Sequence, residues 1–203
     1  MSGNEKNTEQ LILDAARNVF IEKGFDGARM QEIADTAGIN KALLHYYYRS
    51  KDQLFESVFR ESLSTFFPRI FEVMSFPIEL SEKIKLFIDS YIDIILQNPH
   101  IPAFILHELN RNPARITDIL PFTEKTMSGL LSSLSQEIKT AGFIEISPEQ
   151  LVTNMISLCI FPFIARPIIQ PIFLGNDADR FDEFIQNRKT EVTQFILNAL
   201  TKK

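Results

Sequence analysis

The sequence contains a single cysteine, no tryptophan and only seven glycines in 203 residues. Cys159 has no second cysteine with which to form a disulfide inside the chain, so a reducing compartment such as the cytoplasm fits best. The first ten residues are polar and lack the apolar segment of a secretory signal peptide. The chain has no repeat, no glycine-rich phosphate loop and no Cys-His-Asp set for nucleophilic catalysis. These absences favour a cytoplasmic, non-enzymatic protein without a cofactor.

The chain as a whole is not basic, because 26 acidic residues outnumber 21 lysines and arginines and the formal net charge is −5. Any nucleic-acid contact must therefore rest on a local basic patch. One charge-poor stretch, residues 151–174, is long enough to raise the question of a membrane span. Arg166 and three prolines argue against it, since an arginine and unpaired backbone carbonyls are costly in a bilayer. We expect no membrane contact, and instead a buried helix pair or a subunit interface.

Helical periodicity dominates the sequence, and no segment alternates like a strand, so the predicted fold class is all-α. Residues that cap or end helices divide the chain. The expected helices run from Asn7 or Thr8 to Gly24, then over 30–37, 41–47, 51–74, 81–97, 101–109, 117–141, 148–174 and from Asp177 or Asp179 to Leu200. Pro68 should kink or end the helix over 51–74, and an interruption of the helix over 117–141 is expected, if anywhere, near Pro121. Three helices form an N-terminal domain, residues 1–50, and six form a C-terminal domain, residues 51–203.

The segment of residues 29–55 carries the strongest functional signal. It reads RMQEIADTAGINKALLHYYYRSKDQLF, in which two short helices flank Gly38-Ile39-Asn40. A turn of this kind sets the helices at a steep angle and indicates a helix-turn-helix, whose second helix must offer an exposed face to the major groove. From Gly38 to Lys51 the segment has three basic residues and no acidic one, so this edge is locally positive. A plain helical hairpin with a solvated face remains the alternative.

The four-residue spacing of a helix sorts the side chains of the third helix. Lys41 and His45 share the exposed side with Ala42 and Tyr46. Leu44 and Tyr48 should point inward, with Tyr47 between the two sides.

Residues 8–59 resemble the TetR family of transcriptional regulators. The resemblance rests on VFIEKGFDGARM at the end of the first helix and on IADTAGINKALLHYYYRSKDQLF after it. It implies that Lys41, Ala42 and Leu43 face the groove, that His45, Tyr46 and Tyr47 reach bases or phosphates, and that Lys51 binds a phosphate. Arg29 and Gln31 would contact the DNA backbone.

Two positions depart from the family's pattern. Ala28 stands where members often have a threonine that could form a capping box with Gln31. The histidine of the aromatic cluster, His45, lies two places earlier than usual, so base readout should differ.

The family's C-terminal domain generally encloses a ligand pocket, and such pockets are mostly apolar with a few polar groups. The candidate lining residues are Phe67, Phe71, Phe87, Tyr91, Phe104, His107, Arg111, Met127, Met155 and Arg166. Most of the phenylalanines are expected to be core, and Arg166 would either face the pocket or pair with an acid across a dimer interface. His100, His107 and Glu108 are spaced poorly for a metal, and we expect none.

The resemblance implies a homodimer that binds a palindromic operator in double-stranded DNA and is usually a repressor. The last two helices of each chain would form a four-helix bundle across the pair. A small, mainly apolar or aromatic effector would shift the spacing of the recognition helices. Two alternatives stay open: a C-terminal domain that senses a protein partner, and, more remotely, an all-helical enzyme.

Overall fold

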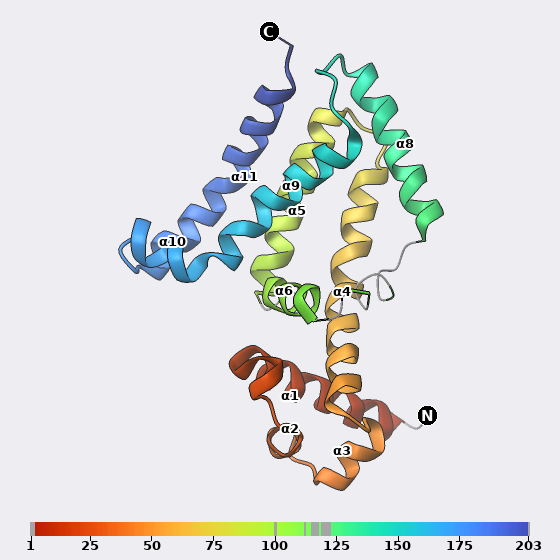
Figure 1. The fold of residues 1–203 in the computed structure, drawn as a ribbon, viewed down its shortest axis with the longest axis vertical. Helices are drawn as coiled ribbons and strands as arrows, with labels where there is room; N and C mark the ends of the chain where they lie inside the picture. Colours follow the sequence, from red (N-terminus) through yellow and green to blue (C-terminus); the bar gives the residue numbers. More distant parts are fainter. Residues whose placement is uncertain (1–2, 100, 112, 115–117, 119–122, 203) are drawn as a thin grey trace.

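The computed structural model describes residues 3–99, 101–111, 113–114, 118 and 123–202, without the side chains of residues 3–6, 65–67 and 69. Every regular element in this part of the chain is a helix (Figure 1). The helices are α1 (Gly3–Gly27), α2 (Met30–Thr36), α3 (Lys41–Tyr47), α4 (Lys51–Ser75), α5 (Leu80–Gln97), α6 (Ile101–Arg111), α8 (Glu124–Thr140), α9 (Pro148–Ile164), α10 (Arg166–Phe173) and α11 (Ala178–Leu200). The predicted all-α fold is confirmed.

The long helix α4 joins two bodies (Figure 1). Its first turns pack against α1, and α1–α3 form a small unit at one end of the molecule. Its later turns pack against α5, in a larger body that also contains α6, α8, α9, α10 and α11. Both bodies therefore share α4, which begins at the predicted domain boundary.

Local capping chemistry sets several helix starts where the sequence predicts them. The side chains of Asn40, Ser50 and Ser147 accept hydrogen bonds from the backbone N–H three residues ahead, at 2.8, 3.2 and 3.3 Å. At the start of α11 the side chain of Asp177 accepts from the N–H groups of Asp179 and Arg180. Each bond satisfies an N–H that the first helical turn leaves without an intrahelical partner.

One predicted helix start is wrong. Helix α1 already begins at Gly3 and passes through Asn7 and Thr8, so neither residue is its N-cap. The helix expected over 117–141, with its interruption near Pro121, is described from Glu124 on as α8, because Thr123 has extended backbone and its side chain caps the Thr126 N–H. Residues 117 and 119–122 lie outside the described part.

The helix predicted over 148–174 is also wrong, because it is two helices. Helices α9 and α10 meet at Ala165 with a bend of 70°. The cause is Pro167, which has no N–H for the helical ladder and whose ring would clash with the carbonyl of Phe163, four residues earlier. Among the described helices, none alone is long and apolar enough to cross a bilayer; this bent pair meets the length and composition only when counted together.

The core is rich in phenylalanine, as the composition suggests. Phe20, Phe55, Phe59, Phe87 and Phe181 are its largest fully buried side chains. The first three belong to the junction of α1 and α4, where the rings of Phe20 and Phe55 meet edge to face at 5.1 Å. Edge-to-face pairs add to the free energy that area burial already supplies.

One buried ion pair ties α5 to α8. The Lys83 ammonium is almost fully buried and donates to the Glu137 carboxylate at 2.7 Å. Ser133 donates to the second oxygen of the same carboxylate at 3.1 Å. Burial of an ammonium is tolerated only with such a partner.

We expect Glu137→Ala to destabilise the fold by about 2–4 kcal/mol, because it leaves a buried lysine charge without a counter-ion. Urea unfolding followed by circular dichroism measures this change. Glu124→Ala, an exposed carboxylate on the same helix, is the control and should change stability by less than about 1 kcal/mol. Equal effects of the two substitutions would contradict a stabilising role for the pair.

Candidate functional site

The turn between α2 and α3 is built by backbone hydrogen bonds around one glycine. Gly38 has a φ of 68°, a left-handed conformation that glycine adopts without strain. Its N–H donates to Asp35 O at 3.1 Å, and the N–H of Ile39 donates to Ala34 O at 3.0 Å. Asn40 then starts α3 as its N-cap. The angle between the two helices is thus fixed by the turn itself.

Helix α3 lies at the end of the small unit far from the larger body (Figure 1), and one side of it is exposed. The exposed residues are Lys41, Ala42, Leu43, His45 and Tyr46, and Tyr46 is 77 % exposed. The Tyr46 ring has no core contact to make and meets only the half-buried ring of its neighbour edge to face, at 5.5 Å. This face follows the spacing that the sequence predicts.

The opposite side of α3 is held by two inward side chains, as predicted. Leu44 is fully buried, and Tyr48 is 7 % exposed. The Tyr48 hydroxyl donates to the carboxylate of Glu9 at 3.2 Å, a contact between α3's end and α1 that sequence analysis missed. Burial, reinforced by the Glu9 charge, raises the pKa of Tyr48 above its usual range, so the hydroxyl keeps the proton that it donates.

The start of α2 presents two more of the predicted DNA-contact residues. Arg29 and Gln31 are both exposed, and the Gln31 amide donates to Asp35 at 2.8 Å. The N-cap position is occupied by Arg29, whose side chain makes no capping bond. Ala28 is buried and lies outside the helix, so the comparison with a capping threonine at that position does not apply to this structure.

Lys51, the predicted phosphate contact, is engaged inside the protein. Its ammonium donates to the carbonyl oxygens of Phe25 at 2.8 Å, Ala28 at 3.0 Å and Asp26 at 3.4 Å. It also lies 4.5 Å from the centre of the Phe25 ring. Three carbonyls account for all three donors of an ammonium. Lys51 therefore ties the start of α4 to the end of α1, and its contact with a phosphate stays a hypothesis.

We expect Lys51→Ala to lower the free energy of unfolding by about 1–3 kcal/mol, because half-buried carbonyls lose their donor. Arg49→Ala removes an exposed charge next to it and should leave the melting temperature unchanged. Thermal unfolding of both variants, with DNA affinity measured at two salt concentrations, separates the roles. A salt slope reduced by about one unit at an unchanged melting temperature would show a phosphate contact instead.

A junction between the small unit and the larger body surrounds the Phe25 ring. The guanidinium of Arg111, at the end of α6, lies 3.9 Å from the centre of this ring and donates to Asp52 at 3.0 Å. The His107 ring lies 5.3 Å from that of Phe25 and 5.5 Å from that of Phe55. Sequence analysis missed this junction, because its members are too far apart in the chain to form a pattern.

The ten predicted pocket residues do not come together around one site. Phe87, Tyr91, Phe104 and Met155 are buried in the core, whereas Phe71 and Met127 are half-buried. Burial raises the pKa of Tyr91 above its usual range, so its hydroxyl is neutral. His107 and Arg111 belong to the junction with the small unit, and the side chain of Phe67 lies outside the described part.

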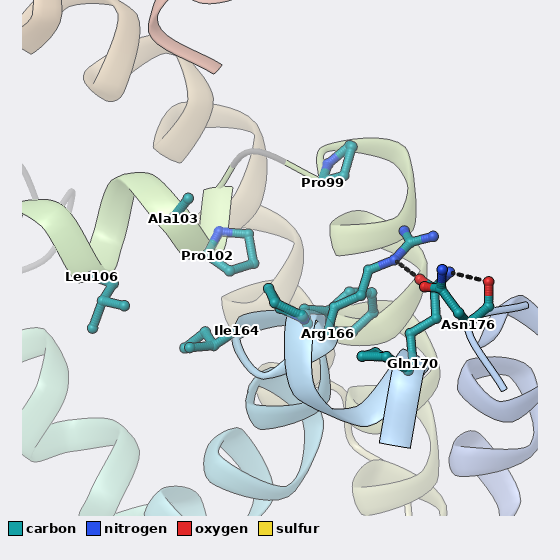
Figure 2. A pocket seen from close by; sticks show the side chains of 11 residues that line it. Pro99, Pro102, Ala103, Leu106, Ile164, Arg166, Gln170 and Asn176 are labelled. Atoms are coloured by element: carbon teal, nitrogen blue, oxygen red, sulfur yellow. Dashed lines mark hydrogen bonds between the residues drawn. The ribbon is translucent and has the colours of Figure 1, made fainter. Parts of the chain in front are cut away.

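Arg166 lies elsewhere, at an open hollow of about 500 Å³ between α6 and the α9–α10 bend (Figure 2). The hollow is lined by Pro99, Pro102, Ala103, Leu106, Phe163, Ile164, Arg166, Pro167, Gln170, Pro171 and Asn176. Within the described residues, no group of three His, Cys, Asp or Glu side chains could hold a metal ion. His100 lies outside those residues.

Comparison with known proteins identifies the small unit. Residues 12–58 match the family model described as "Bacterial regulatory proteins, tetR family". The crystal structure of HlyIIR, a hemolysin II transcriptional regulator, is 26 % identical, covers 98 % of this chain and 99 % of its own, and has a TM-score of 0.64. The chain belongs to the TetR family. It is therefore a DNA-binding transcription regulator with a helix-turn-helix, formed by α2 and α3.

Of three further comparisons, two extend over most of the chain. The fatty acid metabolism regulator protein of Bacillus subtilis is 25 % identical over 146 residues, 69 % of this TetR-family chain and 75 % of the relative. RutR of Escherichia coli is 42 % identical over 55 residues, only 26 % of its length. FadR of B. subtilis, solved with stearoyl-CoA, shares the fold with a TM-score of 0.68 at 17 % identity, over 95 % of this chain and 99 % of its own.

Proposed function

We propose that the protein is a homodimeric, cytoplasmic repressor that binds a palindromic operator through α3 and is released by a small, mainly apolar ligand. The observation that carries the proposal is the exposed face of α3, which leaves Tyr46 and His45 in solvent. An exposed tyrosine ring contributes little to folding. At a groove edge it can pack on a thymine methyl group or a sugar, and a histidine can donate to a base acceptor.

The proposed dimer surface lies on α9, α10 and α11. Phe161, Phe173 and Phe195 are each more than 60 % exposed in the single chain. Apolar hollows adjoin these rings, one between α9 and α11 and one between the α9–α10 bend and α11. Large apolar patches of this kind mark interaction surfaces. A second copy would cover them and place the two α3 helices about one helical turn of DNA apart, roughly 34–36 Å.

The ligand part of the proposal draws on relatives and on the contacts of α6. A relative is named for fatty acid metabolism, and a protein of the same fold was solved with stearoyl-CoA. In this chain α6 carries Arg111, which binds Asp52 and the Phe25 ring of the DNA-binding unit. A ligand that moves α6 would change these contacts. The proposal assigns no catalytic activity to the chain.

We expect Tyr46→Ala and His45→Ala each to weaken binding to the specific operator by about 1–3 kcal/mol, and binding to random DNA much less. The melting temperature should not change, because both side chains are exposed. Fluorescence anisotropy with an operator duplex and a scrambled duplex measures the effect. Thr36→Ala, at an exposed position at the end of α2, is the control. Equal losses on both duplexes, or a lower melting temperature, would contradict base readout by α3.

We expect light scattering to give a mass of two chains at micromolar concentration. Phe195→Asp should shift this mass towards one chain, because it places a charge in an apolar interface. Ile21→Asp introduces the same charge at an exposed apolar position on α1 and should leave the dimer intact. A one-chain mass for the unaltered protein would overturn the dimer.

A further inference from the structure

The hollow between α6 and the α9–α10 bend has two chemically different ends. Figure 2 shows Pro102, Ala103, Leu106 and Ile164 at one end, and Arg166, Gln170 and Asn176 together at the other. The first end offers only carbon atoms of side chains. The second end offers a guanidinium and two amides. A ligand that fills both ends needs an apolar body and a polar group.

The charge at the polar end is held in place but is not neutralised. The Arg166 Nε donates to Gln170 Oε1 at 2.8 Å, and the guanidinium lies 4.5 Å from the centre of the Phe181 ring. Gln170 in turn donates to Asn176 O at 3.3 Å. These contacts orient Arg166, yet no carboxylate of the described chain forms an ion pair with it. Its terminal N–H groups have the geometry that binds a carboxylate with two parallel hydrogen bonds.

We propose that this hollow binds an amphipathic organic anion, whose carboxylate pairs with Arg166 and whose apolar chain lies against Ala103 and Leu106. The volume of about 500 Å³ is within the range of small-molecule sites, roughly 300–1,000 Å³. An apolar chain there removes carbon surface of α6 and α10 from water, which favours binding in proportion to the area covered. The carboxylate then supplies specificity over an alcohol or an amine of equal length.

The site also has a route to the DNA-binding unit, and this step rests on the proposed function. Ala103 and Leu106 of α6 line the hollow, whereas His107 and Arg111 of the same helix contact Phe25. A ligand wedged between α6 and α10 therefore acts on the helix whose end holds Asp52. A ligand that binds more tightly when α6 is displaced would weaken operator binding. By linkage, the operator would weaken ligand binding by the same factor.

The test measures ligand binding without DNA, by isothermal titration calorimetry of the full chain with decanoate, 1-decanol and decylamine below their micelle concentrations. We expect decanoate to bind more tightly than the other two. Arg166→Gln should weaken decanoate binding about tenfold or more. Ala103→Phe, which fills the apolar end, should also weaken it. Lys125→Gln removes an exposed charge on α8 and should leave decanoate binding unchanged.

A second readout uses the absence of tryptophan from the chain. Leu106→Trp places a single tryptophan at the hollow, and its emission should shift to shorter wavelength when decanoate covers it. No decanoate binding, equal binding of decanol, or an unchanged affinity in Arg166→Gln would overturn the site. A shift of Arg166→Gln from two chains to one in light scattering would also overturn it, because the arginine would then pair across the dimer.

Operator release is measured separately, so the two proposals can fail independently. Decanoate should release an operator duplex from the unaltered protein, and Arg111→Ala should still bind decanoate but respond less. Arg166-dependent binding with no release would retain the site and contradict ligand-controlled repression. If the ligand-free protein did not bind the operator, the proposed function would be contradicted. The calorimetric evidence for the ligand site would not be affected.

Discussion

The orientation of the DNA-binding unit depends on one aromatic ring. Phe25 is buried where the end of α1, the start of α4 and the end of α6 meet, and it contacts the rings of Phe55 and His107. Lys51 and Arg111 both place a cation within 4.5 Å of its centre. A cation near a ring is attracted most strongly when water is excluded, so these contacts weaken together if the helices separate. The two bodies can therefore change their relative position only by disturbing this cluster.

Helix α3 differs from this cluster, because most of its side chains are exposed and few contact the core. A seven-residue helix is far too short to be stable alone, so packing and caps must hold it. Leu44 and Tyr48 supply the packing, and Asn40 supplies the cap. Tyr47 is half-buried against the core, and the other side chains of the helix are exposed. Position 46 can carry a tyrosine in solvent because the fold does not depend on it, which makes this face available for recognition of DNA.

Local chemistry explains how much of this could be predicted from the sequence. The bounds of α3 and the caps at Asn40, Ser50 and Ser147 depend on neighbouring residues, and the structure has them as predicted. The exposed side of α3 follows from helical spacing alone. By contrast, the carbonyl partners of Lys51 and the pairing of Arg111 with Asp52 join residues 23 or more positions apart. Neither spacing nor composition records such contacts, so the junction and the placement of the pocket residues were beyond reach.

The proline-directed bend after α9 has the widest consequence for function. It gives α10 two working sides, because residues four apart share a face of a helix. Pro167 and Pro171 line the hollow that faces α6, whereas Ile169 and Phe173 line the apolar hollow beside α11. The same bend thus places one short helix between the proposed ligand site and the proposed dimer surface, so that α10 contributes side chains to both.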